Sequence, residues 1–177
     1  MQILKDTNSK YTILYYENVD IDGLKARNDI ANLIKQVGKK QIYSRAHEWC
    51  CGHGAIGLKL LETGICKHLV LTDKFEPAIQ GCDFTITLND LKNKVTTYNT
   101  DNLGSIPNTE QWDLFVANPP WRSEITPDMF PRSSDEERKK YDLGWNIHNH
   151  MWGNIAKYLT QDAETFLFED KIGRAHV

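Results

Sequence analysis

The residues best suited to chemistry lie between Ala46 and Gly57, where the sequence is Ala-His-Glu-Trp-Cys-Cys-Gly-His-Gly-Ala-Ile-Gly. Gly52 and Gly54 carry no Cβ atom, so the backbone there can approach a ligand closely. A helix that begins directly after such a turn presents unpaired N–H groups to the ligand. Glu48, just before the turn, would repel a phosphate but suits an ammonium group or free hydroxyls. The stretch predicts a site for a nucleotide-like ligand.

A second acid lies at the end of the next apolar segment. Leu69–Thr72 is followed by Asp73, which comes 73 − 54 = 19 residues after Gly54. At this spacing an acid on the next parallel strand meets a ribose diol. The alternative is an ordinary helix cap, because Pro77 suits the first turn of a following helix.

Two further polar segments follow expected strands. Asn99-Thr100-Asp101-Asn102 comes after the strand expected at Val95–Tyr98, and Asn118-Pro119-Pro120-Trp121 ends the apolar run Asp113–Ala117. Asp101 is a candidate ligand or a plain turn residue, since the segment has good turn chemistry. The proline-bearing segment is either a strand stop or the reactive part of the site.

Alternating strands and helices are predicted to position these residues. Tyr11–Tyr16 is aromatic and β-branched and predicts a strand. Between Arg27 and Val37 the apolar residues recur at helical spacing and predict an amphipathic helix. One further strand is expected to begin near Ile42, and four others span Leu69–Thr72, Val95–Tyr98, Asp113–Ala117 and Thr165–Phe168. The other expected helices span Ala55–Leu61 and Pro77–Leu88. A short charged helix is expected to begin at Ser134, and a last one follows the apolar stripe Ile147–Leu159. This alternation predicts an α/β fold with a doubly wound, mainly parallel sheet and helices on both faces.

Composition narrows the class of protein. A chain of 177 residues with 40% hydrophobic residues is expected to form one domain, over residues 1–171. The net charge of −3 argues against tight nonspecific DNA binding. With neither a membrane-length apolar run nor a signal peptide in the sequence, we expect a cytoplasmic protein without a membrane partner.

The cysteines and histidines are not expected to bind a metal. His47, Cys50, Cys51 and His53 are close in sequence, but adjacent ligands in a tight turn rarely reach one metal tetrahedrally. The four cysteines show no Cys-x-x-Cys spacing, so free thiols in a reducing compartment are expected.

The ordered motifs resemble those of class I S-adenosylmethionine-dependent methyltransferases. The matching residues are Glu48–Gly54, Asp73, Asp101 and Asn118–Trp121, and the resemblance spans Ile42 to Asp170. The most similar subgroup carries Asn/Asp-Pro-Pro-aromatic and methylates planar NH2 groups: adenine N6, guanine N2 or the glutamine amide of release factors. Cys50 departs from the glycine that is usual there.

The resemblance implies that S-adenosylmethionine is the cofactor. The implied cofactor-binding residues are Glu48, Cys50, Gly52, Gly54, Asp73 and Asp101. Glu48 and the glycine turn would hold the methionine part, Asp73 the ribose hydroxyls and Asp101 the adenine amino group.

The resemblance also implies how the amino group reacts. An exocyclic NH2 is a poor nucleophile because its lone pair is delocalised. The Asn118 side-chain oxygen and the Pro119 carbonyl would accept its two N–H bonds and favour the pyramidal nitrogen of the transition state. Pro120 would help to fix the direction of that carbonyl. Trp121 would stack on a planar substrate.

A nucleic-acid substrate, DNA or RNA, is expected ahead of a protein substrate. The broad indole of Trp121 suits a purine better than a glutamine amide. Release-factor methylases carry a separate helical domain in front, whereas only about 40 residues precede the glycine turn here, too few for such a domain. Arg122, Arg132 and Lys140 are candidates for phosphate contacts, although the neighbouring acids favour a solvated helix.

Two functions of other classes share this pattern. A nicotinamide-dependent oxidoreductase would use Gly52-x-Gly54-x-x-Gly57 as a dinucleotide fingerprint together with Asp73, but would leave Asn118–Trp121 without a role. A cofactor-binding scaffold without catalysis is the other alternative.

The end of the sequence does not continue the alternation of strands and helices. Residues 172–177, Ile-Gly-Arg-Ala-His-Val, resemble a translated sequencing adapter and are expected to be a non-native tail. The family sheet usually has two more strands after the fifth, so a truncated C-terminus with an exposed sheet edge is also expected.

Overall fold

A computed structural model describes residues 3–7, 9–16, 22–120 and 141–168 of the chain. Trp121, the charged helix expected from Ser134 and the tail at 172–177 lie outside the described residues.

The helices and strands alternate along the chain as expected. The strands are β1 (Ile3–Asp6), β2 (Ile13–Tyr16), β3 (Tyr43–Trp49), β4 (Cys66–Asp73), β5 (Val95–Asn99), β6 (Trp112–Ala117) and β7 (Leu159–Leu167). The α-helices are α1 (Asp22–Val37), α2 (Ala55–Glu62), α3 (Glu76–Leu88) and α5 (Asn146–Asn154), and the short 3₁₀ turns are η1 (Leu103–Ser105), η3 (Leu143–Trp145) and η4 (Ile155–Tyr158).

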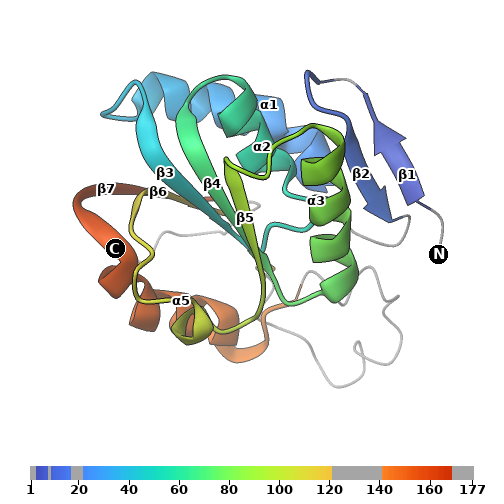
Figure 1. The fold of residues 1–177 in the computed structure, drawn as a ribbon. Coiled ribbons are helices and arrows are strands. Elements are labelled where there is room, and N and C mark those ends of the chain that lie inside the picture. The colour runs from blue at the N-terminus through green and yellow to red at the C-terminus, as the bar shows by residue number, and fades with distance from the viewer. Residues whose placement is uncertain (1–2, 8, 17–21, 121–140, 169–177) are drawn as a thin grey trace.

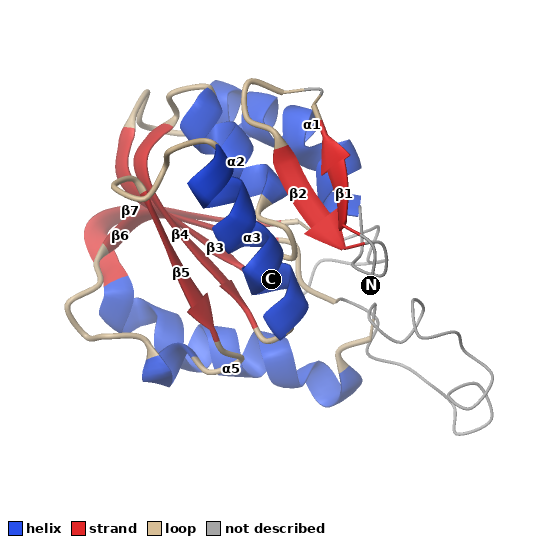
Figure 2. Cartoon of the chain, turned by 45° about the vertical axis from the view of Figure 1, so that its right-hand side comes forward, coloured by secondary structure: helices blue, strands red, loops and turns tan. Residues whose placement is uncertain are grey.

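The five strands β5-β4-β3-β6-β7 form one parallel sheet in that order. Helices α1, α2 and α3 cover one face of this sheet and α5 covers the other (Figures 1 and 2). The predicted doubly wound parallel sheet is therefore confirmed.

Alternation along the strands explains the two covered faces. In β4, Leu69 and Leu71 belong to the core under α1, α2 and α3, whereas Val70 between them belongs to the core under α5. Successive side chains of a strand point to opposite faces, so a strand buried on both faces is apolar throughout. Strand β6 shows the same property, since all six of its residues are buried.

One predicted boundary was wrong. The apolar stripe through Leu159 was expected to be helical, but α5 ends at Asn154 and Leu159 opens β7. Pairing of Leu159 with Trp112 of β6 overrides the helical spacing there. The first central strand ends close to where it was expected, because β3 continues only one residue beyond Glu48, to Trp49.

The antiparallel hairpin of β1 and β2 packs beside α3, and its first strand was not predicted from the sequence. Leu14 N donates to Thr85 Oγ1 at 2.8 Å, and a Cβ at Gly81 would lie 3.1 Å from the Leu14 carbonyl oxygen. Gly81 thus lets the hairpin lie against the helix.

No helix within the described ranges is long and apolar enough to cross a bilayer.

Candidate functional site

The predicted cofactor residues meet at the carboxyl edge of the sheet. Trp49 at the end of β3 is in register with Thr72 of β4 and with Ala117 of β6, and Asp73 is in register with Asn99 of β5. The sheet order reverses between β3 and β6, and ligands of open α/β sheets bind at such a switch point. The structure therefore brings the strand ends that carry the motifs to one edge.

The turn after β3 has left-handed backbone at three alternate residues. The φ angle is 55° at Cys50, 52° at Gly52 and 70° at Gly54. A Cβ at Gly54 would also lie 2.6 Å from Leu71 Cδ1. A Cβ at Gly52 would have no atom within 4 Å, so glycine is favoured there by the φ angle alone. For a residue with a Cβ this conformation costs about 1–2 kcal/mol. Cys50 carries that strain at a position where the resembling family usually has glycine.

Glu48 is buried behind this turn, with 2% of its surface exposed. Its Oε2 accepts a hydrogen bond of 2.7 Å from Gly57 N, in the first turn of α2. A Cβ at Gly57 would lie 2.8 Å from that oxygen and 2.7 Å from Leu69 Cδ1, so only glycine fits. Burial raises the pKa of Glu48 to about 8, and the carboxylate of Asp73 acts in the same direction. Glu48 therefore caps α2 and holds the turn in place.

Asp73 joins the glycine turn to the start of α3. Its Oδ2 accepts from Gly52 N at 2.8 Å, and its Oδ1 accepts from Phe75 N, also at 2.8 Å. Burial raises the pKa of Asp73 above its ordinary value, against the lowering effect of these N–H donors. Each carboxylate oxygen has a second lone pair, so backbone bonding and ribose bonding are compatible.

Asp101 is exposed in the loop between β5 and η1. Thr100 N, directly before it, donates to the Asp73 carbonyl at 2.9 Å. Directly after it, the Asn102 side chain accepts from Gly104 N at 2.7 Å and caps η1. The loop is a well-bonded turn, as its composition predicted, and it carries Asp101 at the same sheet edge as Asp73.

Asn118, Pro119 and Pro120 leave the end of β6. Pro119 is buried, while Asn118 and Pro120 are partly exposed. The Ala117 carbonyl just before them accepts from Phe168 N at 2.8 Å, which fastens this strand end to the end of β7. The three residues therefore start from a fixed point beside the glycine turn.

Several neighbours of the turn were not found from the sequence. The ring of Tyr15 in β2 lies edge-on to His53, 5.0 Å between centroids, and His53 is buried within the turn. No spacing rule links positions so far apart. In α5, His148 and Met151 are buried and Trp152 is exposed.

The cysteines around the turn are free thiols, as expected. Burial raises the pKa of the Cys50 and Cys51 thiols well above the ordinary range, so both stay protonated and weakly nucleophilic. Among the residues that the structure describes, no group of three His, Cys, Asp or Glu side chains is arranged to hold a metal.

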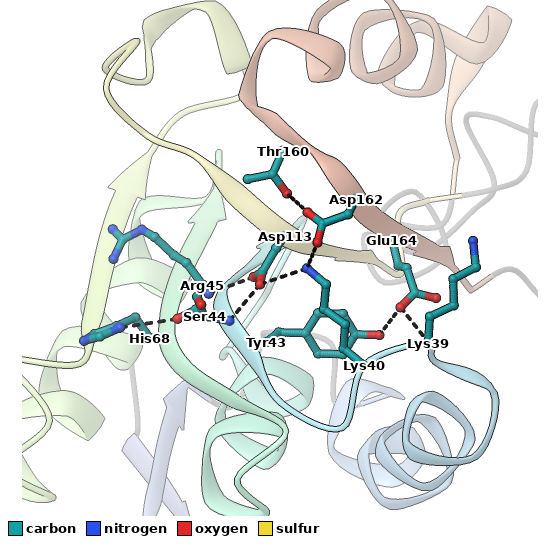
Figure 3. A network of polar contacts seen from close by, with 10 residues as sticks. All are labelled: Lys39, Lys40, Tyr43, Ser44, Arg45, His68, Asp113, Thr160, Asp162 and Glu164. Carbon is teal, nitrogen blue, oxygen red and sulfur yellow. Dashed lines mark hydrogen bonds and ion pairs between the residues drawn. The ribbon is translucent and has the colours of Figure 1, made fainter.

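The opposite, amino edge of the sheet holds a polar cleft of about 300 Å³. Its lining residues are Lys40, Ser44, Arg45, Gln111, Asp113, Thr160 and Asp162. Asp113 accepts from Ser44 N and Arg45 N, each at 2.9 Å, and Lys40 Nζ lies 2.8 Å from Asp162 (Figure 3). Lys40, just before β3, pairs with Asp113 of β6 and Asp162 of β7, so this network ties the edge strand β7 to the sheet.

Comparison with protein families gives one match over most of the site. Residues 29–130 match the methyltransferase small domain family. This range contains the glycine turn, Asp73, Asp101 and the Asn-Pro-Pro-Trp segment. No curated protein sequence matches the chain significantly.

Solved structures of methyltransferases share the fold. The Thermus thermophilus 16S rRNA N2 G1207 methyltransferase, in complex with S-adenosylmethionine and guanosine, aligns with a TM-score of 0.64 and 16% identity over 94% of this chain and 41% of its own. The hMettl16 catalytic domain, in complex with an RNA hairpin, aligns at 0.64 and 11% identity over 86% and 60%. The ribosomal protein L11 methylase of Lactobacillus delbrueckii subsp. bulgaricus aligns at 0.52 and 18% identity over 79% and 58%. The chain thus spans less than two thirds of each of these structures.

Proposed function

The chain belongs to the methyltransferase small domain family, and from that premise we propose that it transfers a methyl group from S-adenosylmethionine to a planar amino nitrogen of a nucleic-acid base. Enzymes of this family depend on S-adenosylmethionine, whose sulfonium supplies an electrophilic methyl group when the cofactor is bound. The chain's own residues must then hold the cofactor and present the nitrogen.

The residues at the sheet edge fit this cofactor. Within the turn from Cys50 to Gly54, Gly52 is partly exposed, and no atom lies within 4 Å of where its Cβ would be. Asp73 retains acceptor capacity for two ribose hydroxyls while its backbone bonds to Gly52 and Phe75 fix its position. Asp101 is exposed and available to an amino group.

The observation that carries the proposal is the segment Asn118-Pro119-Pro120-Trp121 directly after β6, on the strand adjacent to the glycine turn. The Asn118 side-chain oxygen and the Pro119 carbonyl supply two acceptors for the two N–H bonds of an amino group. Both bonds strengthen as the nitrogen becomes pyramidal and gains positive charge, which stabilises the transition state more than the ground state. Proline restricts the backbone and preserves this orientation.

We rank a nucleic-acid base above a protein amide as the substrate. Two of the similar structures are described with guanosine or an RNA hairpin, and one is a methylase of a ribosomal protein. The indole of Trp121 offers a broad face on which a purine can stack. Glutamine N5 of a protein such as a release factor is the competing substrate.

A ligand titration tests the class of the enzyme. Calorimetry with S-adenosylhomocysteine and with NADH should show binding of the first alone. Binding of NADH alone would favour an oxidoreductase and refute the proposal.

Label transfer tests the substrate. The chain is incubated with methyl-labelled S-adenosylmethionine and total RNA, genomic DNA or release factor. We expect label in nucleic acid, and label confined to protein would reverse our ranking. Asn118→Ala should abolish transfer and leave cofactor affinity within about twofold, because its side chain acts on the nitrogen and not on the cofactor. Asn149→Ala, at an exposed residue of α5, is the matched control.

A further inference from the structure

The loop that carries Asp101 is hydrogen-bonded to residues of α5 and η4, and no sequence motif indicates these contacts. Leu103 N donates to His150 Nε2 at 3.0 Å. The single hydroxyl hydrogen of Tyr158 is shared between the Leu103 carbonyl and, at 2.8 Å, the Ile106 carbonyl. Leu103 is fully buried, and although its carbonyl also accepts from Ile106 N at 3.1 Å, its N–H is bonded to His150.

Asp101 lies between two fixed points. On its amino side, Thr100 N is bonded to the Asp73 carbonyl at 2.9 Å. On its carboxyl side, Leu103 N is bonded to His150. Only Asn102 separates Asp101 from Leu103, and Asn102 is itself bonded to Thr100 Oγ1 at 2.9 Å. Little freedom remains for the Asp101 backbone while both ends are held.

His150 also contacts the strand that leads into the glycine turn. Its imidazole stacks on the Trp49 indole, with 6.3 Å between centroids and 27° between the planes. Trp49 directly precedes Cys50 and is buried. One side chain of α5 therefore touches both the end of β3 and the loop after β5, the two segments that flank Asp73 in the sheet.

We propose that His150 is a positioning residue that aims Asp101 at the exocyclic amino group of the cofactor's adenine and so determines the preference for adenine. The inference rests on the proposed function, because it assumes that the cofactor is S-adenosylmethionine. His150 acts through Leu103 N: as an acceptor it keeps the loop in one conformation, and a loop released from it aligns the carboxylate poorly with the amino group.

The test compares two ligands that differ at position 6 of the purine and, with it, in the protonation of N1. S-adenosylhomocysteine carries the adenine amino group, and S-inosylhomocysteine carries an oxygen in its place. Wild-type protein should prefer the first by at least about tenfold, as expected for a hydrogen bond between an amino group and a carboxylate. The measured quantity is the ratio of the two dissociation constants, obtained by calorimetry for each variant.

Two substitutions separate the hydrogen bond from packing. His150→Leu keeps an apolar side chain against Trp49 but removes the acceptor, and the preference for adenine should fall to about threefold or less. His150→Gln restores an acceptor near the position of Nε2 and should recover most of the preference. Trp152→Ala, on the exposed face of the same helix, is the control and should keep the wild-type ratio.

Tyr158→Phe tests the same loop independently, since it removes the hydroxyl bonds to Leu103 and Ile106 and keeps the ring. It should also reduce the ratio, which keeps the proposal testable if His150→Leu does not fold. An unchanged ratio in folded His150→Leu, or equal weakening of both ligands, would overturn the positioning role. If wild-type protein binds neither ligand, the proposed function itself fails.

Discussion

The pH dependence of stability depends strongly on Glu48, and Glu48→Gln tests the electrostatics of the turn. The pKa of Glu48 rises from 4.5 to about 8, chiefly because the carboxyl group is buried. A carboxyl group with a raised folded-state pKa stabilises the fold fully below its unfolded pKa. That contribution is lost as the pH rises through the folded pKa, because the unfolded chain releases the proton first.

The size of the effect follows from the shift. A rise of about 3.5 pKa units corresponds to about 5 kcal/mol at 1.36 kcal/mol per unit. This is an upper bound, because the N-terminal dipole of α2 also favours the ionised form. Glutamine does not titrate, and its carbonyl oxygen can still accept from Gly57 N. The unfolding free energy of Glu48→Gln minus that of wild type should therefore increase by up to about 5 kcal/mol from pH 4.5 to pH 8.

Urea denaturation followed by circular dichroism measures this difference at several pH values across the window. Glu76→Gln, at an exposed acid in the first turn of α3, is the control for the loss of one carboxyl group. A difference between Glu48→Gln and wild type that is constant with pH, or that shrinks toward pH 8, would refute the reasoning. It would mean that the N–H donors outweigh burial and that Glu48 is ionised in the folded protein.

Two further substitutions test the site. Asp73→Ala should weaken S-adenosylhomocysteine binding by about 1–3 kcal/mol, because ribose hydroxyls lose their acceptor; unchanged affinity in the folded variant would show that the cofactor site is wrongly assigned. Gly57→Ala should lower the unfolding free energy by roughly 1–3 kcal/mol, because its Cβ would lie 2.7 Å from Leu69 Cδ1 and 2.8 Å from Glu48 Oε2. Gly153→Ala in α5 meets no atom within 4 Å and should be neutral or stabilising in the same denaturation assay; equal losses for both glycines would contradict the steric argument.

Local pattern was sufficient to predict most of the fold. The glycine turn before Ala55 and the proline in the first turn at Pro77 marked the starts of two helices that the structure contains. The apolar run Asp113–Ala117 indicated a strand buried on both faces, and β6 is such a strand. Parallel pairing then follows from alternation of strands and helices, and in the structure the motifs that follow these strands lie at one edge of the sheet.

The segment at Leu159 shows where the spacing of apolar residues fails to predict the secondary structure. Its apolar spacing suits a helix, but pairing with Trp112 makes it a strand. The polar network at the amino edge could not be predicted from the sequence either, because its members lie far apart in the chain, 73 residues for Lys40 and Asp113 and 162 − 40 = 122 for Lys40 and Asp162.

The roles of the site residues required the tertiary structure. Sequence alone placed Glu48 and Asp73 at strand ends and suggested what they could bind. The folded chain decided that Glu48 caps α2 through Gly57 and that Asp73 bonds to Gly52. The periodicity of apolar residues shows which residues three or four apart share a helix face and which alternate residues share a strand face. A hydrogen bond such as Leu103 N to His150, between residues 47 apart, exists only because the sheet and α5 bring the two segments together.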